Sequence, residues 1–139
     1  LVVKREMFMR FSAHPSNVSV ARIAVATFAA GADFTIPDIE EIKVAVSEAV
    51  SNAVLHAYPG GEGEVTVSVT SQGDELVIEV RDQGCGIPDI EKAKEPGFTT
   101  VPEHMGLGLS FIESFMDSVS LESEVGSGTA VRMVKKRCP

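Results

Sequence analysis

Positive charge is scarce in this chain of 139 residues, in which 12 Lys and Arg stand against 20 Asp and Glu for a formal net charge of −8. So acidic a chain has no electrostatic reason to bind the phosphate backbone of a nucleic acid, and we expect no direct nucleic-acid role. Any phosphorylated ligand has to be attracted locally, by backbone N–H groups and a divalent metal ion.

Cysteine and long apolar runs are also rare. Cys85 lies among glycines and Cys138 is the penultimate residue, so the two do not suggest a disulfide framework and fit a reducing cytoplasm. No uncharged stretch approaches the roughly 18 residues that a membrane-spanning helix needs. The N-terminus interleaves charged residues with apolar ones and lacks the apolar core of a signal peptide. We therefore expect a cytoplasmic protein without a membrane segment.

Several familiar site patterns are absent as well. The chain has neither the G-x-x-x-x-G-K-[ST] phosphate loop nor the G-x-G-x-x-G dinucleotide fingerprint. His14, His56 and His104 do not have metal-ligand spacing with one another or with the cysteines, so a zinc site is not expected. His56 is interpreted as a helix-end residue near the functional site.

The apolar patterns predict one domain, residues 1–139, because a chain of this length with 44% hydrophobic residues can bury one sizeable core. They indicate a strand at 8–13, helices at 18–30, 37–56 and 107–116, a hairpin over 65–81, and strands at 118–124 and 129–135. The helix at 18–30 has Arg22 as its only charge and is expected to be buried over most of its surface. Residues 88–105 are interpreted as a short helix leading into a mobile loop.

This order of elements favours an α+β fold. We predict a two-layer sandwich in which a mixed, largely antiparallel sheet carries its helices on one face. The ligand would then lie between the layers, under the loops.

The first motif is Glu48-x-x-x-Asn52 on the helix at 37–56, where a spacing of four residues places both side chains on one face. Asn52 offers a neutral oxygen to Mg²⁺, and Glu48 can take a proton from an attacking hydroxyl. Alternatively, the two residues are only part of a solvated helix rim.

The second motif, Asp82-Gln83-Gly84-Cys85-Gly86, directly follows a strand. A carboxylate at a strand end can accept the exocyclic amine of adenine, and it disfavours guanine, which has a carbonyl oxygen there. The glycines allow backbone to approach a flat ring. The alternative is an ordinary Asp-Gly turn.

Two further glycine motifs complete the set. Gly106-Leu107-Gly108 precedes an apolar helix, so free N–H groups and the positive end of the helix dipole meet at a glycine turn that can hold phosphate. Alternatively, this motif is only a hinge or a helix start. Gly126-Ser127-Gly128-Thr129 is the weakest signal, since a hairpin turn explains it equally well.

In this order the four motifs resemble the N, G1, G2 and G3 boxes of the GHKL, or Bergerat-fold, ATPases, and the chain is most similar to the anti-sigma factor serine kinases of the sporulation type. The resemblance covers residues 5–136 and is strongest at 46–53, 81–90, 98–100, 115–117 and 122–125. It implies binding of ATP or ADP with Mg²⁺, with Glu48 as general base and Asn52 as Mg²⁺ ligand. The implied nucleotide-binding residues are Asn52, Asp82, Gly84, Gly86, Ile87, Thr100, Gly106, Leu107, Gly108 and Thr129.

The resemblance further implies a homodimer that inhibits a sporulation sigma factor and phosphorylates a serine on an anti-anti-sigma factor. Arg22 matches a position suited to docking these partners, although a surface arginine with its stem along apolar surface is an equal alternative. Rival interpretations are an anti-sigma module that binds nucleotide without useful kinase activity, and a histidine-kinase catalytic domain, which is ranked last because no phospho-acceptor helices precede the first strand.

One departure from the family concerns the ATP lid, about residues 88–105. Related lids carry a Lys or Arg just before the G2 glycines, whereas this chain has none between Lys94 and Gly106 and its lid is about two residues shorter. The sequence therefore predicts nucleotide binding with slow phosphoryl transfer, and it leaves His104 as the nearby side chain able to lend positive charge.

Overall fold

The computed structural model describes residues 4–56, 58, 62–84 and 108–137. Within these ranges the chain forms five strands and three helices. Their bounds in chain order are β1 Arg5–Ser12, α1 Asn17–Ala30, α2 Ile36–His56, β2 Glu64–Gln72, β3 Glu75–Asp82, α4 Gly108–Phe115, β4 Ser118–Glu124 and β5 Gly128–Lys136.

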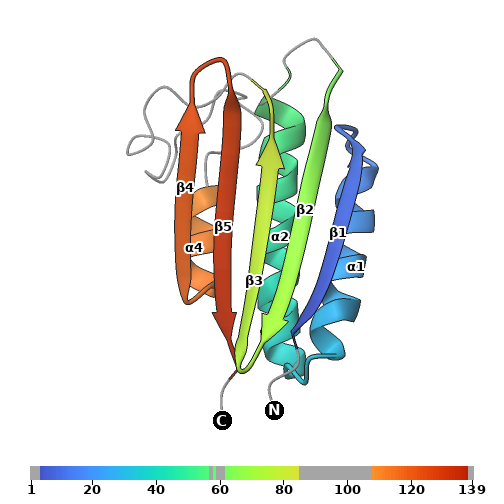
Figure 1. Ribbon diagram of the computed structural model, residues 1–139, viewed down its shortest axis with the longest axis vertical. Helices are drawn as coiled ribbons and strands as arrows, with labels where there is room; N and C mark the ends of the chain where they lie inside the picture. The colour runs from blue at the N-terminus through green and yellow to red at the C-terminus, as the bar shows by residue number, and fades with distance from the viewer. Residues whose placement is uncertain (1–3, 57, 59–61, 85–107, 138–139) are drawn as a thin grey trace.

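The strands form one sheet in the order β1-β2-β3-β5-β4, and the helices cover one of its faces (Figure 1). Every strand pair in this sheet is antiparallel. The predicted α+β sandwich with helices on one face is therefore confirmed. Within the described residues the sheet is antiparallel throughout, whereas a mixed, largely antiparallel sheet was predicted.

The core lies between the sheet and the helices because the strands alternate as their sequences predict. Val65, Val67 and Val69 of β2 are fully buried, while the residues between them lie on the other face. On α2 the buried positions recur at helical spacing, at Ile42, Ala45, Val46, Ala49, Val50 and Ala53. Helix α2 consequently packs against α1, α4 and the sheet at once, and it is the central helix of the layer.

Helix α1 differs from its prediction. Its buried residues are Ala21, Val25, Phe28 and Ala29, but Val20 and Ile23 have exposed fractions of 55% and 60%. The helix lies at the side of the layer and contacts α2 and β1, so only one of its faces meets the core. A helix with few charges was expected to be buried over most of its surface, and that expectation was wrong.

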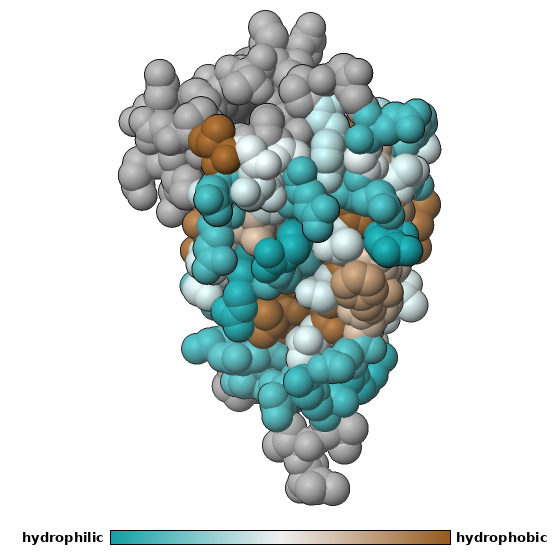
Figure 2. Space-filling model, turned by 45° about the horizontal axis from the view of Figure 1, so that its top comes forward, coloured by the Kyte–Doolittle hydropathy of each residue, from teal (hydrophilic) through white to brown (hydrophobic). Residues whose placement is uncertain are grey.

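The opposite face of the sheet carries no helix in the described part of the chain. Figure 2 shows this face tilted forward, with hydrophilic side chains over most of it and small apolar areas between them. Phe8, on the edge strand β1, is the most exposed aromatic residue described, at 67%. None of the helices described is long and apolar enough to cross a membrane.

Candidate nucleotide site

The ends of several strands and helices that carry or adjoin the motifs lie toward one end of the molecule. Strands β3 and β4 finish there, β5 begins there, and α2 ends there with α4 beginning nearby (Figure 1). The antiparallel register places Asp82 of β3 directly opposite Thr129 of β5, and Thr129 opposite Ser123 of β4. Residues that are distant in sequence thus come together because strand ends and helix ends share one edge.

Helix α2 supplies Glu48 and Asn52. Both side chains are half-buried and lie one helical turn apart, beside the fully buried Ala49. The two side chains therefore lie at the rim of the core and not in open solvent. A carboxylate and a carboxamide placed so can act on one bound ligand.

Asp82 is one of the two buried charged or polar residues in the described chain, with 8% of its surface exposed. The backbone N–H of Gly84 donates to its Oδ1 at 2.9 Å. Burial raises the pKa of the Asp82 carboxyl above its usual value of 3.8, and hydrogen bonds from the backbone of Gly84 and Thr129 oppose that rise. A buried carboxylate held by backbone N–H groups retains acceptor capacity for one further donor.

The turn between β4 and β5 closes over Asp82. Gly128 has φ of 112°, and a Cβ at this position would collide with the backbone carbonyl of Asp82 and the Cα of Gln83. The Ser123 and Thr129 hydroxyls lie 2.9 Å apart, and Ser123 Oγ donates to the Gly128 carbonyl at 3.2 Å. Gly128 is therefore a close-approach position, which goes beyond the hairpin turn that its sequence alone indicated.

Helix α4 begins at Gly108 and runs to Phe115. Its C-terminal end is fixed by Lys135 of β5, whose buried Nζ donates to the Phe115 carbonyl at 2.6 Å and to Glu41 Oε2 of α2 at 3.2 Å. This contact joins α4, α2 and the sheet. Of the two ends of α4, the N-terminal one lies nearer to the end of the molecule where β3 finishes (Figure 1), and its first backbone N–H groups have no acceptor within the helix itself.

Some of the predicted site lies outside the described residues. This holds for Gly86, Ile87, Thr100, Gly106, Leu107, His104 and the segment at about 88–105. The structure brings together Asp82, Gly84 and Thr129. Helix α2, which carries Glu48 and Asn52, ends at the same end of the molecule, and α4, which starts at Gly108, begins on that side (Figure 1). Arg22 lies on α1 and donates to Ser47 Oγ of α2 at 3.4 Å.

Tyr58 is a neighbour of the site that none of the four motifs includes. Its hydroxyl donates to the Glu64 carbonyl at 2.7 Å and accepts the N–H of Gln83 at 2.8 Å. The available signal was its position between the Asn52 helix and the hairpin as the one tyrosine of the chain.

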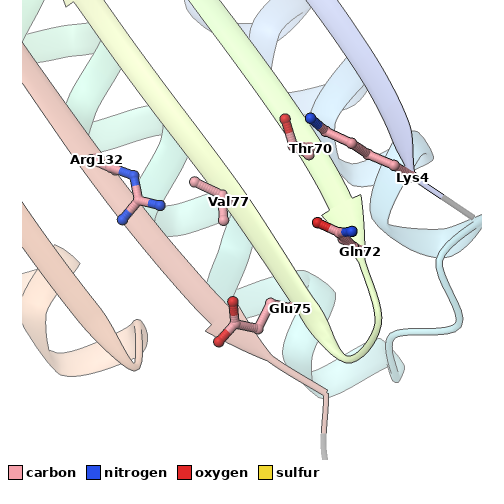
Figure 3. A pocket seen from close by; sticks show the side chains of 6 residues that line it. All are labelled: Lys4, Thr70, Gln72, Glu75, Val77 and Arg132. Carbon is pink, nitrogen blue, oxygen red and sulfur yellow. The ribbon is translucent and has the colours of Figure 1, made fainter. Parts of the chain in front are cut away.

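A separate hollow of about 290 Å³ lies on the uncovered face of the sheet, near the β2–β3 turn (Figure 3). Its lining is polar except for Val77 and consists of Lys4, Thr70, Gln72, Glu75, Val77 and Arg132. None of the predicted site residues lines it.

No group of three or more His, Cys, Asp or Glu among the described residues is arranged to hold a metal ion. A Mg²⁺ ion bound with a nucleotide does not need such a group, since it takes phosphate oxygens and waters together with one or two protein oxygens. The Asn52 carboxamide oxygen fits that requirement.

This fold and this arrangement of strand and helix ends define the class of protein. The family model of the histidine kinase-like ATPase domain matches residues 11–135, and the chain belongs to that family. Membership of this ATPase family implies that the chain binds ATP or ADP.

Within this class, the chain is similar to anti-sigma F factors. It is 45% identical to that of Clostridium acetobutylicum over 97% of this chain and 96% of the relative. It is 46% identical to that of Geobacillus stearothermophilus, over 98% and 95% of the two chains, and 45% identical to that of Bacillus subtilis, over 96% and 93%.

Solved structures share the fold at lower identity. A structure of the RsbU and RsbW domains of a Mycobacterium tuberculosis protein matches with a TM-score of 0.69 at 18% identity, over 96% of this chain and 32% of that one. A histidine kinase domain from a blue-light activated kinase of Erythrobacter litoralis matches with a TM-score of 0.54 at 23% identity, over 72% and 45% of the two chains.

Proposed function

We propose that this protein is an anti-sigma factor that binds a sporulation sigma factor and uses Mg²⁺ and ATP to phosphorylate a serine on an anti-anti-sigma factor. The observation that carries the proposal is the near full-length identity of 43–46% to anti-sigma F factors, in a chain of the ATPase family. The position of Glu48 one helical turn from Asn52 on α2 supports the proposed kinase activity.

The binding half of the mechanism rests on three elements. At the end of β3, the Asp82 carboxylate would accept a hydrogen bond from the exocyclic amine of adenine. Gly84, Gly86 and Ile87 of the following segment would lie against the adenine ring. Thr129 supports the same end from β5. The N-terminus of α4 with Gly106, Leu107 and Gly108 would receive the phosphates, because the helix dipole and backbone N–H groups at a helix start favour negative charge. Thr100 is proposed as a further nucleotide-binding residue.

The catalytic half rests on α2. Asn52 would hold Mg²⁺, and that ion would neutralise part of the negative charge of the phosphates. The Glu48 carboxylate accepts the proton of the serine hydroxyl while the serine oxygen forms a bond to the terminal phosphorus of ATP. The bond between that phosphorus and the leaving oxygen of ADP breaks in the same step. The products are the phosphoserine partner and ADP, and the proton rests on Glu48.

Arg22 is proposed as part of the surface that docks the protein partners. Its guanidinium is tied to Ser47, the residue before Glu48, so a partner seated on α1 would contact the helix that carries the general base. We further propose that the chain acts as a cytoplasmic homodimer of single-domain subunits.

The test is to incubate the purified protein with Mg²⁺, ATP and its serine-bearing partner, and to weigh the partner by mass spectrometry. One added phosphate that is absent with Glu48→Gln supports the kinase. If the partner stays unmodified while the sigma factor is still bound, the second candidate holds, a nucleotide-binding anti-sigma module with little kinase activity. The lack of Lys and Arg between Lys94 and Gly106 favours that second candidate.

A further inference from the structure

Tyr58 joins three parts of the chain that meet beside the nucleotide site. It lies two residues beyond the end of α2 at His56. Its hydroxyl bridges the Glu64 carbonyl, at the start of β2, and the Gln83 N–H, just past the end of β3, at 2.7 and 2.8 Å. Its ring covers Gly63, where a Cβ would collide with the ring atoms.

The Gln83 N–H is the first backbone donor after Asp82, and it lies beyond the residues that pair in the sheet. Asp82 is thus restrained from several directions. Gly84 donates to its carboxylate, Gly128 allows β5 to pack against its backbone, and Tyr58 holds the peptide that follows it. Of these three contacts, only the hydrogen bond from Tyr58 involves the segment that follows α2.

We propose that Tyr58 is a positioning residue for adenine recognition: its hydroxyl holds the Asp82–Gln83 peptide so that the Asp82 carboxylate faces the adenine amine. The inference rests on the proposed role of Asp82 in binding ATP. Since Tyr58 follows the helix that carries Asn52, the same hydroxyl also sets the base-reading carboxylate relative to the metal-binding end of α2.

A merely structural tyrosine predicts something different. If the hydroxyl only fastens the start of β2, its loss lowers stability and weakens every nucleotide to the same degree. If it positions Asp82, its loss weakens selectively those nucleotides that carry the exocyclic amine. The ligand pair that separates the two roles is ATP and purine riboside triphosphate, which lacks that amine and is otherwise the same.

The experiment compares wild type with Tyr58→Phe, which keeps the ring over Gly63 and removes only the hydroxyl. Calorimetry with Mg²⁺ should show ATP bound about three- to tenfold more weakly, as expected for one lost hydrogen bond, and purine riboside triphosphate bound equally by both proteins. The matched control is Thr27→Val on the exposed face of α1, which removes a hydroxyl that donates to the Ile23 carbonyl. It should leave both affinities unchanged.

A second measurement tests the contact itself. By NMR hydrogen exchange, the Gln83 amide should exchange faster in Tyr58→Phe than in wild type, and the Gly84 amide should follow because its acceptor Asp82 becomes less fixed. Equal exchange at Gln83 in both proteins, or equal weakening of both nucleotides, would overturn the proposal. Failure of the wild type to prefer ATP over the amine-free nucleotide would instead remove the role of Asp82 in the proposed function.

Discussion

At the scale of single residues, Asp82 lowers stability at neutral pH and is the residue proposed to read adenine. Burial raises the pKa of its carboxyl, so the folded state holds the proton more tightly than the unfolded state does. The stability that this proton contributes is complete below pH 3.8 and is lost as pH rises through the folded-state pKa. At neutral pH the ionised, buried Asp82 therefore lowers the free energy of unfolding.

We predict that Asp82→Asn raises the free energy of unfolding at pH 7 and severely weakens ATP binding. The amide keeps an oxygen for the Gly84 N–H without the buried charge, but it cannot give a charge-assisted bond to the adenine amine, a loss of about 1.5–3 kcal/mol. Urea unfolding from about pH 4 to pH 7 should show the gap between variant and wild type widening as pH rises. Unchanged ATP affinity by calorimetry would contradict the base-reading role.

The proposed role of Glu48 as general base can be separated from binding. Glu48→Gln keeps the shape of the side chain but cannot accept a proton, so we predict retained ATP and sigma-factor binding with serine phosphorylation slower by roughly 10² or more. Glu40→Gln is the matched control, because Glu40 lies on the exposed face of the same helix beside Lys43. Phosphorylation near the wild-type rate in Glu48→Gln would make Glu48 structural.

At the scale of elements, the β4–β5 turn offers a direct comparison of two glycines. Gly126 and Gly128 both have positive φ, at 86° and 112°, but only Gly128 lies against other backbone. We predict that Gly126→Ala costs about 1–2 kcal/mol of strain, whereas Gly128→Ala costs more and also weakens ATP binding, since β5 must move away from Asp82. Equal losses in thermal unfolding and in ATP affinity would show that the close approach has no role.

Most elements could be predicted because each carries its own local pattern. Alternation in β2 and β3, and the helical spacing of Ile42, Val46, Ala49 and Ala53 on α2, depend only on near neighbours along the chain. The exposure of Val20 and Ile23 could not be predicted, because composition does not say whether a helix lies at the middle or at the side of a layer.

The contacts that organise the candidate site were beyond local patterns for the same reason. These contacts are hydrogen bonds from Lys135 to Glu41 and Phe115, between Tyr58 and Gln83, and between Ser123 and Thr129. The first two depend on how distant elements pack, and the third depends on strand register. The motifs placed Asp82 at a strand end correctly, but only the packed structure shows what holds it there.

At the scale of the whole molecule, the residues proposed for recognition and those proposed for chemistry belong to different parts of the fold. The sheet end holds Asp82 and Thr129, and α2, which carries Glu48 and Asn52, ends at the same end of the molecule. Arg22 of α1 is tied to α2 through Ser47. Binding of the base, transfer of phosphate and docking of a partner should therefore respond to different substitutions.

His104 lies outside the described residues, and the sequence offers no Lys or Arg between Lys94 and Gly106. A cation near the terminal phosphate acts mainly on charge that develops during transfer, so its lack slows the chemistry more than it weakens binding. We predict that His104→Arg accelerates single-turnover phosphorylation of the partner serine while the ATP-dependent rise in Tm is unchanged. Saturating ATP at about 100 times Kd should stabilise both proteins by about 2.7 kcal/mol.

The pH dependence of transfer provides the control. An imidazole gains positive charge as pH falls through the neutral range, whereas a guanidinium stays charged, so wild type should become faster from about pH 8 to pH 6 and His104→Arg should change little. His104→Ala should be slow throughout and should show the same rise in Tm. If all three proteins transfer phosphate at the same rate, a cation at this position has no part in the reaction, and the difference from related lids does not limit the enzyme.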